Sequence, residues 1–158
     1  MPSINKTEHK LFLVCPICQM EAFIKGHFGD VFFMTAPAAI FHFAGNTLGT
    51  LHHLIVKEQI RDIYLVADIG CTFTHNVLTN TNRTDLPCEK IIDQLKTQED
   101  TALTLTEKIL ASQYSTLQSA EILGNEIASG NIVLHTLLSN KQENTITPVN
   151  LMKWNFKS

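Results

Sequence analysis

The apolar run RDIYLVADI, residues 61–69, constrains the fold of this chain more than any other segment. It is rich in β-branched residues and continuous enough to be buried on both faces, which is typical of a central strand in a parallel sheet. Two shorter apolar runs, at 10–17 and 29–37, precede it, and segments of helical composition separate the three. Alternation of this kind predicts an α/β fold, with a parallel central sheet flanked by helices and right-handed crossovers.

The second half of the chain carries mostly helical patterns. We expect, in order, an irregular stretch at 75–100 with a short amphipathic piece at 88–98, helices at about 99–113 and 115–129, a strand at 131–139, and an extended edge or tail at 144–154. No repeat, low-complexity block or linker interrupts this order. The sequence therefore predicts a single domain over residues 1–158.

Composition excludes several classes of partner. The 158 residues are 44% hydrophobic and 17% charged, with a net charge of −3, which fits a globular protein with no broad attraction to nucleic acid or anionic lipid. The longest uncharged stretch, 31–53, is broken by Pro37 and His42, so we expect no membrane span. The run LFLVC is too short for a signal peptide. We expect a cytoplasmic protein whose four cysteines are reduced or metal-bound rather than paired in disulfides.

Possible metal ligands follow the first and third predicted strands. Ligands bind beyond the carboxyl ends of the strands in an open parallel sheet, and Cys15 with Cys18, and Asp68 with Cys71, lie at such ends. The Cys-x-x-Cys pair could be a redox pair, half of a zinc site or two buried thiols. Asp68 could equally cap a turn, and Cys71 with His75 could be a ligand pair or a buried thiol beside a surface histidine.

For the remaining histidines and the last cysteine, the sequence gives weaker indications of a functional role. One of His52 and His53 should face the core, and His135 should be a structural residue of a strand. No role follows for His42. Cys88 is expected in a polar loop with no obvious partner.

In order and spacing, about residues 9–150 resemble the β-class carbonic anhydrases. LFLVCPICQ occupies the place of the family's Cys-x-Asp-x-Arg, GHFGDVFFM has its Gly-Asp, FHFAGN has its Ala-Gly-Asn, and VADIGC stands where its third strand ends in His-x-x-Cys. The resemblance implies a parallel sheet flanked by helices and a homodimer or higher homo-oligomer. It also implies zinc held by Cys, His and Cys, whose bound hydroxide attacks carbon dioxide beside an Asp–Arg dyad.

Only some of the family's functional residues are found at the matching positions of this chain. Cys15 and Cys71 match the two thiolate ligands, whereas the histidine falls on Asp68. The dyad Asp falls on Ile17 and the dyad Arg on Gln19. The resemblance thus implies a zinc site at Cys15, Asp68 and Cys71, for which Cys18 and His75 are possible further ligands. The family's Arg-Asn before Ala-Gly-Asn is replaced by His42 and Phe43.

These differences from the family should slow the hydration of carbon dioxide at such a zinc site. Two thiolates and a carboxylate leave a zinc site at −1, so bound water is acidified less than with a neutral histidine. Ile17 cannot accept a hydrogen bond from the nucleophile, and Gln19 carries no charge. We therefore expect a carbonic-anhydrase-like binding or regulatory protein without efficient carbon dioxide hydration, with zinc retained.

Three alternatives stay open. If no metal binds, Ile17 and Phe43 would fill the pocket. An active protein would be a zinc-dependent lyase or hydrolase of the carbonic anhydrase type, with a small-molecule substrate. A third possibility is a thiol redox protein that uses Cys15 and Cys18.

Overall fold

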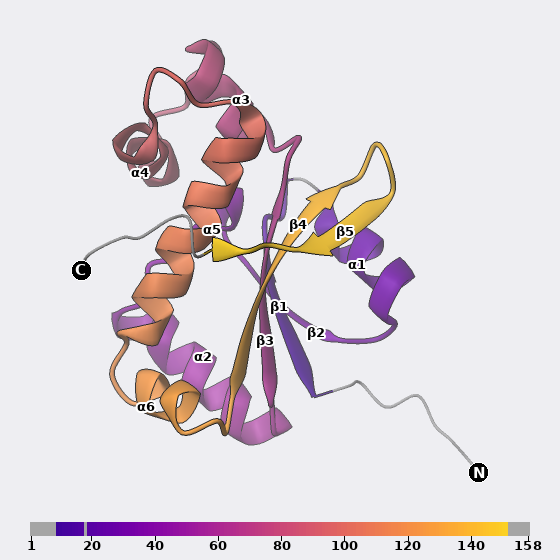
Figure 1. Ribbon diagram of the computed structural model, residues 1–158. Helices are drawn as coiled ribbons and strands as arrows, with labels where there is room; N and C mark the ends of the chain where they lie inside the picture. The colour runs from indigo at the N-terminus through magenta and orange to yellow at the C-terminus, as the bar shows by residue number, and fades with distance from the viewer. Residues whose placement is uncertain (1–8, 18, 152–158) are drawn as a thin grey trace.

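The computed structural model describes residues 9–17 and 19–151, and places them around one five-stranded sheet (Figure 1). The strand order is β2-β1-β3-β4-β5. The strands are β1 (Lys10–Val14), β2 (Phe32–Thr35), β3 (Asp62–Asp68), β4 (Val133–Asn140) and β5 (Thr145–Pro148). The first four are parallel, and β5 turns back antiparallel to β4. The prediction of a parallel central sheet is confirmed, with β3 in its middle.

Helices cover both faces of the sheet. They are α1 (Met20–Phe28), α2 (Gly45–Glu58), α3 (Thr72–Thr79), α4 (Pro87–Leu95), α5 (Ala102–Gln118) and α6 (Leu123–Ala128), with a 3₁₀ turn η1 (Pro37–Ala39) after β2. In Figure 1, α2, α5 and α6 lie on one side of the strands and α1 lies on the other. Within the described ranges, no helix is both long enough and apolar enough to cross a bilayer.

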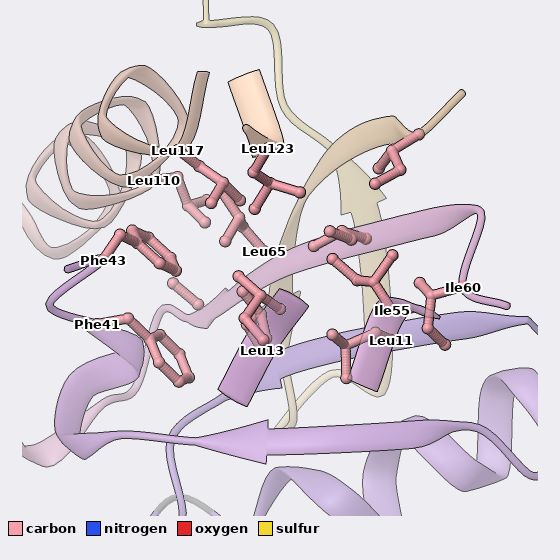
Figure 2. Packing of buried hydrophobic residues seen from close by; sticks show 14 residues of the cluster. Leu11, Leu13, Phe41, Phe43, Ile55, Ile60, Leu65, Leu110, Leu117 and Leu123 are labelled. Atoms are coloured by element: carbon pink, nitrogen blue, oxygen red, sulfur yellow. The ribbon is translucent and has the colours of Figure 1, made fainter. Parts of the chain in front are cut away.

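The larger core fills the space between the sheet and α2, α5 and α6. Leu11, Leu13 and Leu65 project from β1 and β3 towards Ile55 of α2 and Leu110 of α5 (Figure 2). All five are buried, and each such side chain contributes about 1.5–3 kcal/mol relative to exposure. The strands therefore alternate, with these residues on one face and their neighbours on the other.

A row of rings crosses the opposite face, under α1. The register sets Phe12 of β1 beside Phe33 on one side and Tyr64 on the other, and Tyr64 beside His135 of β4. Phe12 and Tyr64 stack with ring centroids 4.3 Å apart, as do Tyr64 and His135. His135 also makes a 2.8 Å contact from Nε2 to Oδ1 of Asp62. This confirms its predicted structural role.

Two predicted segments differ from the structure. The amphipathic piece predicted at 88–98 is confirmed as α4, which begins at Pro87, but the irregular stretch before it starts later than predicted because α3 runs on to Thr79. The helices predicted at 99–113 and 115–129 are instead a long α5 and a short α6. A capping box between Thr101 and Thr104 begins α5, and the break falls after residue 118, where Ile122 has a left-handed φ of 65°.

Candidate functional site

Three cysteines from distant parts of the chain share one buried cluster at the carboxyl end of the sheet. Cys15 directly follows β1, Cys71 is the N-cap residue of α3, and Cys88 lies in the first turn of α4. Their exposed fractions are 4%, 5% and 6%. We call these residues the thiol cluster. The apolar residues packed with them are Ala38, Ala39, Ile40, Phe73, Val77, Ile92, Leu105 and Ile109.

The loop between β2 and α2 closes over Cys15. The Ala38 backbone N–H donates a 3.2 Å hydrogen bond to Sγ of Cys15, and Ala38 adopts a left-handed φ of 60° to do so. Further along the loop, the Phe41 N–H donates to Oε1 of Gln113 at 2.8 Å. Gln113 belongs to α5, so this bond ties the loop to the helix that covers the sheet. The thiol of Cys15 is held by backbone geometry and not by packing alone.

Cys88 is a neutral thiol at neutral pH. Burial raises its pKa to about 11, and the nearby Glu89, Cys71 and Cys15 add to the shift because their charges oppose a thiolate. The expectation that Cys88 lies in a polar loop without a partner is wrong. Pro at the first position of a helix and apolar residues four and seven positions after Cys88, at Ile92 and Leu95, could have identified this buried helical position.

Asp68 occupies a different environment from the cysteines. Its Oδ1 accepts hydrogen bonds from the Ser139 hydroxyl at 2.7 Å and the Lys141 backbone N–H at 3.2 Å, and its Oδ2 accepts from the Gly70 N–H at 2.9 Å. It is 8% exposed and follows Val66 on the face of β3 that packs towards α1. The carboxylate closes the turn after β3 and links it to the end of β4.

The described residues show no gathered zinc site at the predicted ligands. Among the residues that the structure describes, no three His, Cys, Asp or Glu side chains are gathered so that they could hold a metal. A carboxylate has about four lone-pair positions, and protein donors already take three of those on Asp68. Cys15 and Cys71 are brought into one apolar cluster, whereas Asp68 follows Val66, whose side chain packs in the core on the α1 side of the sheet. Zinc at these residues stays a prediction.

The other candidate ligands do not complete a metal site with the described cysteines. Cys18 lies outside the described residues. His75 lies on α3 but is exposed, whereas Cys71 one turn earlier is buried. His42 is exposed, and of the two adjacent histidines in α2, His52 is half-buried and His53 is exposed.

The positions that the resemblance assigns to the dyad hold Ile17 and Gln19. Ile17 is 59% exposed in the turn after β1, and Gln19 is the exposed N-cap residue of α1 with a φ of 52°. The expectation that Ile17 and Phe43 fill a vacated pocket is therefore wrong. Ile17 faces solvent, and Phe43 packs in the larger core against Phe41 (Figure 2).

Solved structures place the architecture. The β-carbonic anhydrase CafA of Aspergillus fumigatus aligns with a TM-score of 0.75 over 90% of this chain and 76% of its own, at 16% identity. The fold is that of a β-carbonic anhydrase. The Coccomyxa β-carbonic anhydrase, solved with acetazolamide, gives a TM-score of 0.73 at 12% identity and covers 91% of this chain and 72% of its own.

A third structure with this fold bears on assembly. One of two β-carbonic anhydrases from Sordaria macrospora, described as tetrameric, gives a TM-score of 0.68 at 13% identity, over 91% of this chain and 81% of its own. No protein-family model and no curated protein sequence matches the chain. At such low identities the β-carbonic anhydrase likeness is one of fold, and the chemistry depends on the residues of this chain.

Proposed function

We propose that this chain is a carbonic-anhydrase-like protein that does not hydrate carbon dioxide efficiently and acts instead as a binding or regulatory protein. The observation that carries the proposal is the carboxylate of Asp68, which stands where the resemblance calls for an imidazole ligand. It is hydrogen-bonded to Ser139, Gly70 and Lys141. To coordinate a metal beside Cys15 and Cys71, the carboxylate would have only about one lone-pair position that these donors leave free.

The groups that would orient a nucleophile are also missing from the expected positions. An aliphatic side chain such as Ile17 can neither accept a proton nor hold a hydrogen bond. Gln19 is neutral and exposed, so it supplies no fixed positive charge. Residues of this chain at the dyad positions therefore provide neither a hydrogen-bond acceptor nor a counter-ion, which supports the absence of efficient hydration.

The proposed assembly is a homo-oligomer, with a homodimer as its simplest form. Support comes from β2, which lies at the edge of the sheet with Phe32, Phe33 and Met34 only half-buried. The tetrameric Sordaria proteins share the fold. Light scattering should give a mass at least twice the 17.7 kDa of one chain. A monomer at micromolar concentration would contradict this part of the proposal.

Stopped-flow measurement of carbon dioxide hydration tests the function directly. The purified protein is assayed as isolated and after incubation with zinc, and its metal content is measured in both samples. We expect no acceleration above the buffer rate in either sample. Hydration at rates typical of enzymes in the zinc-treated sample would overturn the proposal.

Matched variants separate the alternatives if activity is found. A zinc lyase or hydrolase that uses Cys15, Asp68 and Cys71 would lose its activity and its zinc in Cys15→Ser and in Cys71→Ser. A thiol redox protein would instead show accelerated alkylation near neutral pH, because reactive cysteines have lowered pKa values. Cys18→Ser would remove that reactivity.

A further inference from the structure

We propose that the segment 152–158 of this chain docks in an apolar groove of the same molecule, with Trp154 as the side chain that fills it. The groove lies between α5, α6 and the start of β4. In Figure 1 this is the end of the sheet opposite to α3 and α4, which carry part of the thiol cluster. The inference is therefore independent of metal binding and of the hydration of carbon dioxide.

The groove has room for one large side chain. Its volume is about 330 Å³, within the range of roughly 300–1,000 Å³ in which proteins hold small molecules. Small residues at Gly124, Ala128 and Gly130 line part of it. Val133 also lines it and is 48% exposed. An exposed aliphatic side chain that adjoins an apolar groove makes a surface of the kind that marks an interaction site.

The direction of β5 leads the chain towards this groove. β5 runs antiparallel to β4, and the Val149 N–H donates a 3.1 Å hydrogen bond to the Thr136 carbonyl, so the chain after β5 runs towards the start of β4. The β5 arrow points towards α5 in Figure 1. Leu151, the last described residue, packs against the larger core. Three residues that line the groove pack against the same core, namely Tyr114, Ile127 and Leu134.

The length of the segment suits the distance it has to cover. Val133 lies three positions before Thr136, which is about 10 Å along a strand. Trp154 lies three positions after Leu151, and three extended residues also reach about 10 Å. The indole can therefore enter the groove while Leu151 stays in the core.

Charge and composition match the segment to the groove. Residues 109–140, which include every residue that lines the groove, contain Glu121 and Glu126 and no Lys, Arg or Asp. The segment, MKWNFKS, contains two lysines and no acidic residue. Opposite charges on two surfaces favour their association, and a tryptophan buries about 150–250 Å² when it docks. The side chain of Gln118 in the groove lining offers an acceptor for the indole N–H.

Tryptophan fluorescence tests the docking directly, because Trp154 is the only tryptophan of the chain. The reference compound is N-acetyltryptophanamide, whose indole is fully solvated. We expect the protein to emit at shorter wavelength than this compound and to be quenched less by acrylamide. Emission and quenching equal to those of the free compound would overturn the proposal.

Two matched variants test whether the groove is the place of docking. Ala128 is the last residue of α6 and lines the groove, whereas its neighbour Ser129 does not, and both are exposed. Ala128→Lys and Ser129→Lys add the same charge at a helix C-terminus, where a cation is favourable, so both should fold. Ala128→Lys should shift the emission to longer wavelength and restore quenching, and Ser129→Lys should do neither. Equal fluorescence of the two variants would overturn the assignment to this groove.

Photocrosslinking locates the segment without altering the groove. With benzoylphenylalanine in place of Trp154, ultraviolet light should link position 154 to peptides from residues 114–134, which span the groove lining. An equal mixture of isotopically light and heavy protein separates the two sources of such links. We expect links within one isotopic form only. Links between light and heavy chains would show that the segment docks on a second copy, and links only to other regions would show that it docks elsewhere; either result would overturn the proposal.

Discussion

Asp68 at the end of β3 accepts a 2.7 Å hydrogen bond from Ser139 of β4, 71 residues further along the chain. Ser139 is fully buried, and the same carboxylate accepts the backbone N–H groups of Gly70 and Lys141. One side chain thus holds the turn that leads from β3 to α3 and the turn that leads from β4 to β5. A residue in a ligand position of the resemblance links two strands in this structure.

Asp68→Ala should destabilise the protein strongly. The substitution leaves the buried Ser139 hydroxyl and two backbone N–H groups without their acceptor, and hydrogen bonds to charged groups contribute about 1.5–3 kcal/mol each. We expect the free energy of unfolding in urea to fall by at least about 3 kcal/mol, which is below the sum of the three bonds because the amide of the exposed Gly70 can bond to water instead. Ser139→Ala, which removes one of these bonds, should cost less.

A chelator distinguishes this role from metal binding. If Asp68 acts as a link between strands, the effect of Asp68→Ala should be the same with and without a strong zinc chelator. A stability loss that disappears in the chelator-treated protein would instead identify Asp68 as a ligand. The double variant with Ser139→Ala should be less destabilised than the sum of the single variants, because the two side chains share a bond.

Alkaline pH should weaken the fold through Cys88. Its pKa is raised to about 11 in the folded protein, so between about pH 9 and 11 the unfolded chain loses a proton that the folded protein keeps. The free energy of unfolding should therefore fall across this window, by an amount on the order of 2 kcal/mol. Cys88→Ala should show a shallower fall, as followed by urea titrations at several pH values. Equal slopes in both proteins would contradict the assignment.

Acid pH should act through Asp100, which precedes α5. Burial tends to raise its pKa, but hydrogen bonds from Lys108 at 2.8 Å, the Thr97 N–H at 2.7 Å and the Thr104 hydroxyl at 2.7 Å outweigh it and hold the pKa below its ordinary value. Because this pKa is lowered on folding, the ionised carboxylate stabilises the folded protein at pH values above the unfolded pKa of about 3.9. This stabilisation is lost as the pH falls below that value.

Asp100→Asn measures this contribution. The difference in unfolding free energy between the original protein and the variant should be widest near neutral pH and should narrow below about pH 4. Glu99→Gln, at the exposed neighbouring position, is the control and should show little difference at either pH. If the difference in unfolding free energy between the original protein and Asp100→Asn did not change with pH, the charge of Asp100 would not contribute to stability.

Glu89 should control the order of the loop between α3 and α4. The side-chain and backbone hydrogen bonds from Thr84, and the bond from Arg83, lower the pKa of Glu89, and both carboxylate oxygens accept the Thr84 N–H at 3.0 Å. Glu89→Ala should speed hydrogen exchange at the Thr84 amide by at least about tenfold, because exposed loop amides exchange through local opening. The exposed Lys90→Ala serves as the control; unchanged exchange in Glu89→Ala would contradict this role.

Much of the fold could be predicted from local pattern. The run at 61–69 has the length, the continuity and the β-branched residues of a buried strand, and β3 forms within it, with its backbone paired between two other strands. The break between α5 and α6 is harder to predict from the sequence. It depends on the left-handed conformation of Ile122, which few sequences would indicate, and on the tight approach at Gly124, where an added Cβ would lie 2.4 Å from the Gln118 carbonyl oxygen.

The site was harder to predict than the fold. Asp68 ends a strand and Cys15 and Cys71 come after strands, but spacing alone does not say which side chains share an environment. Ser139 lies 71 residues from Asp68, and only the parallel register of β3 and β4 brings them together. The environment of Cys88 is hard to predict for the same reason, because this residue joins the thiol cluster only through the packing of α4 against α3.

The link between Asp68 and Ser139 also limits how this protein can change over time. Substituting histidine at position 68 would replace an anion that satisfies three donors with a ring that cannot satisfy all of them. The intermediate would lose stability before it gained a ligand, and Ile17 and Gln19 would still lack the groups of the dyad. A stable protein with a histidine at position 68 would therefore need coordinated changes on two strands, because the donors from β4 and from the turns after β3 and β4 would need a new acceptor.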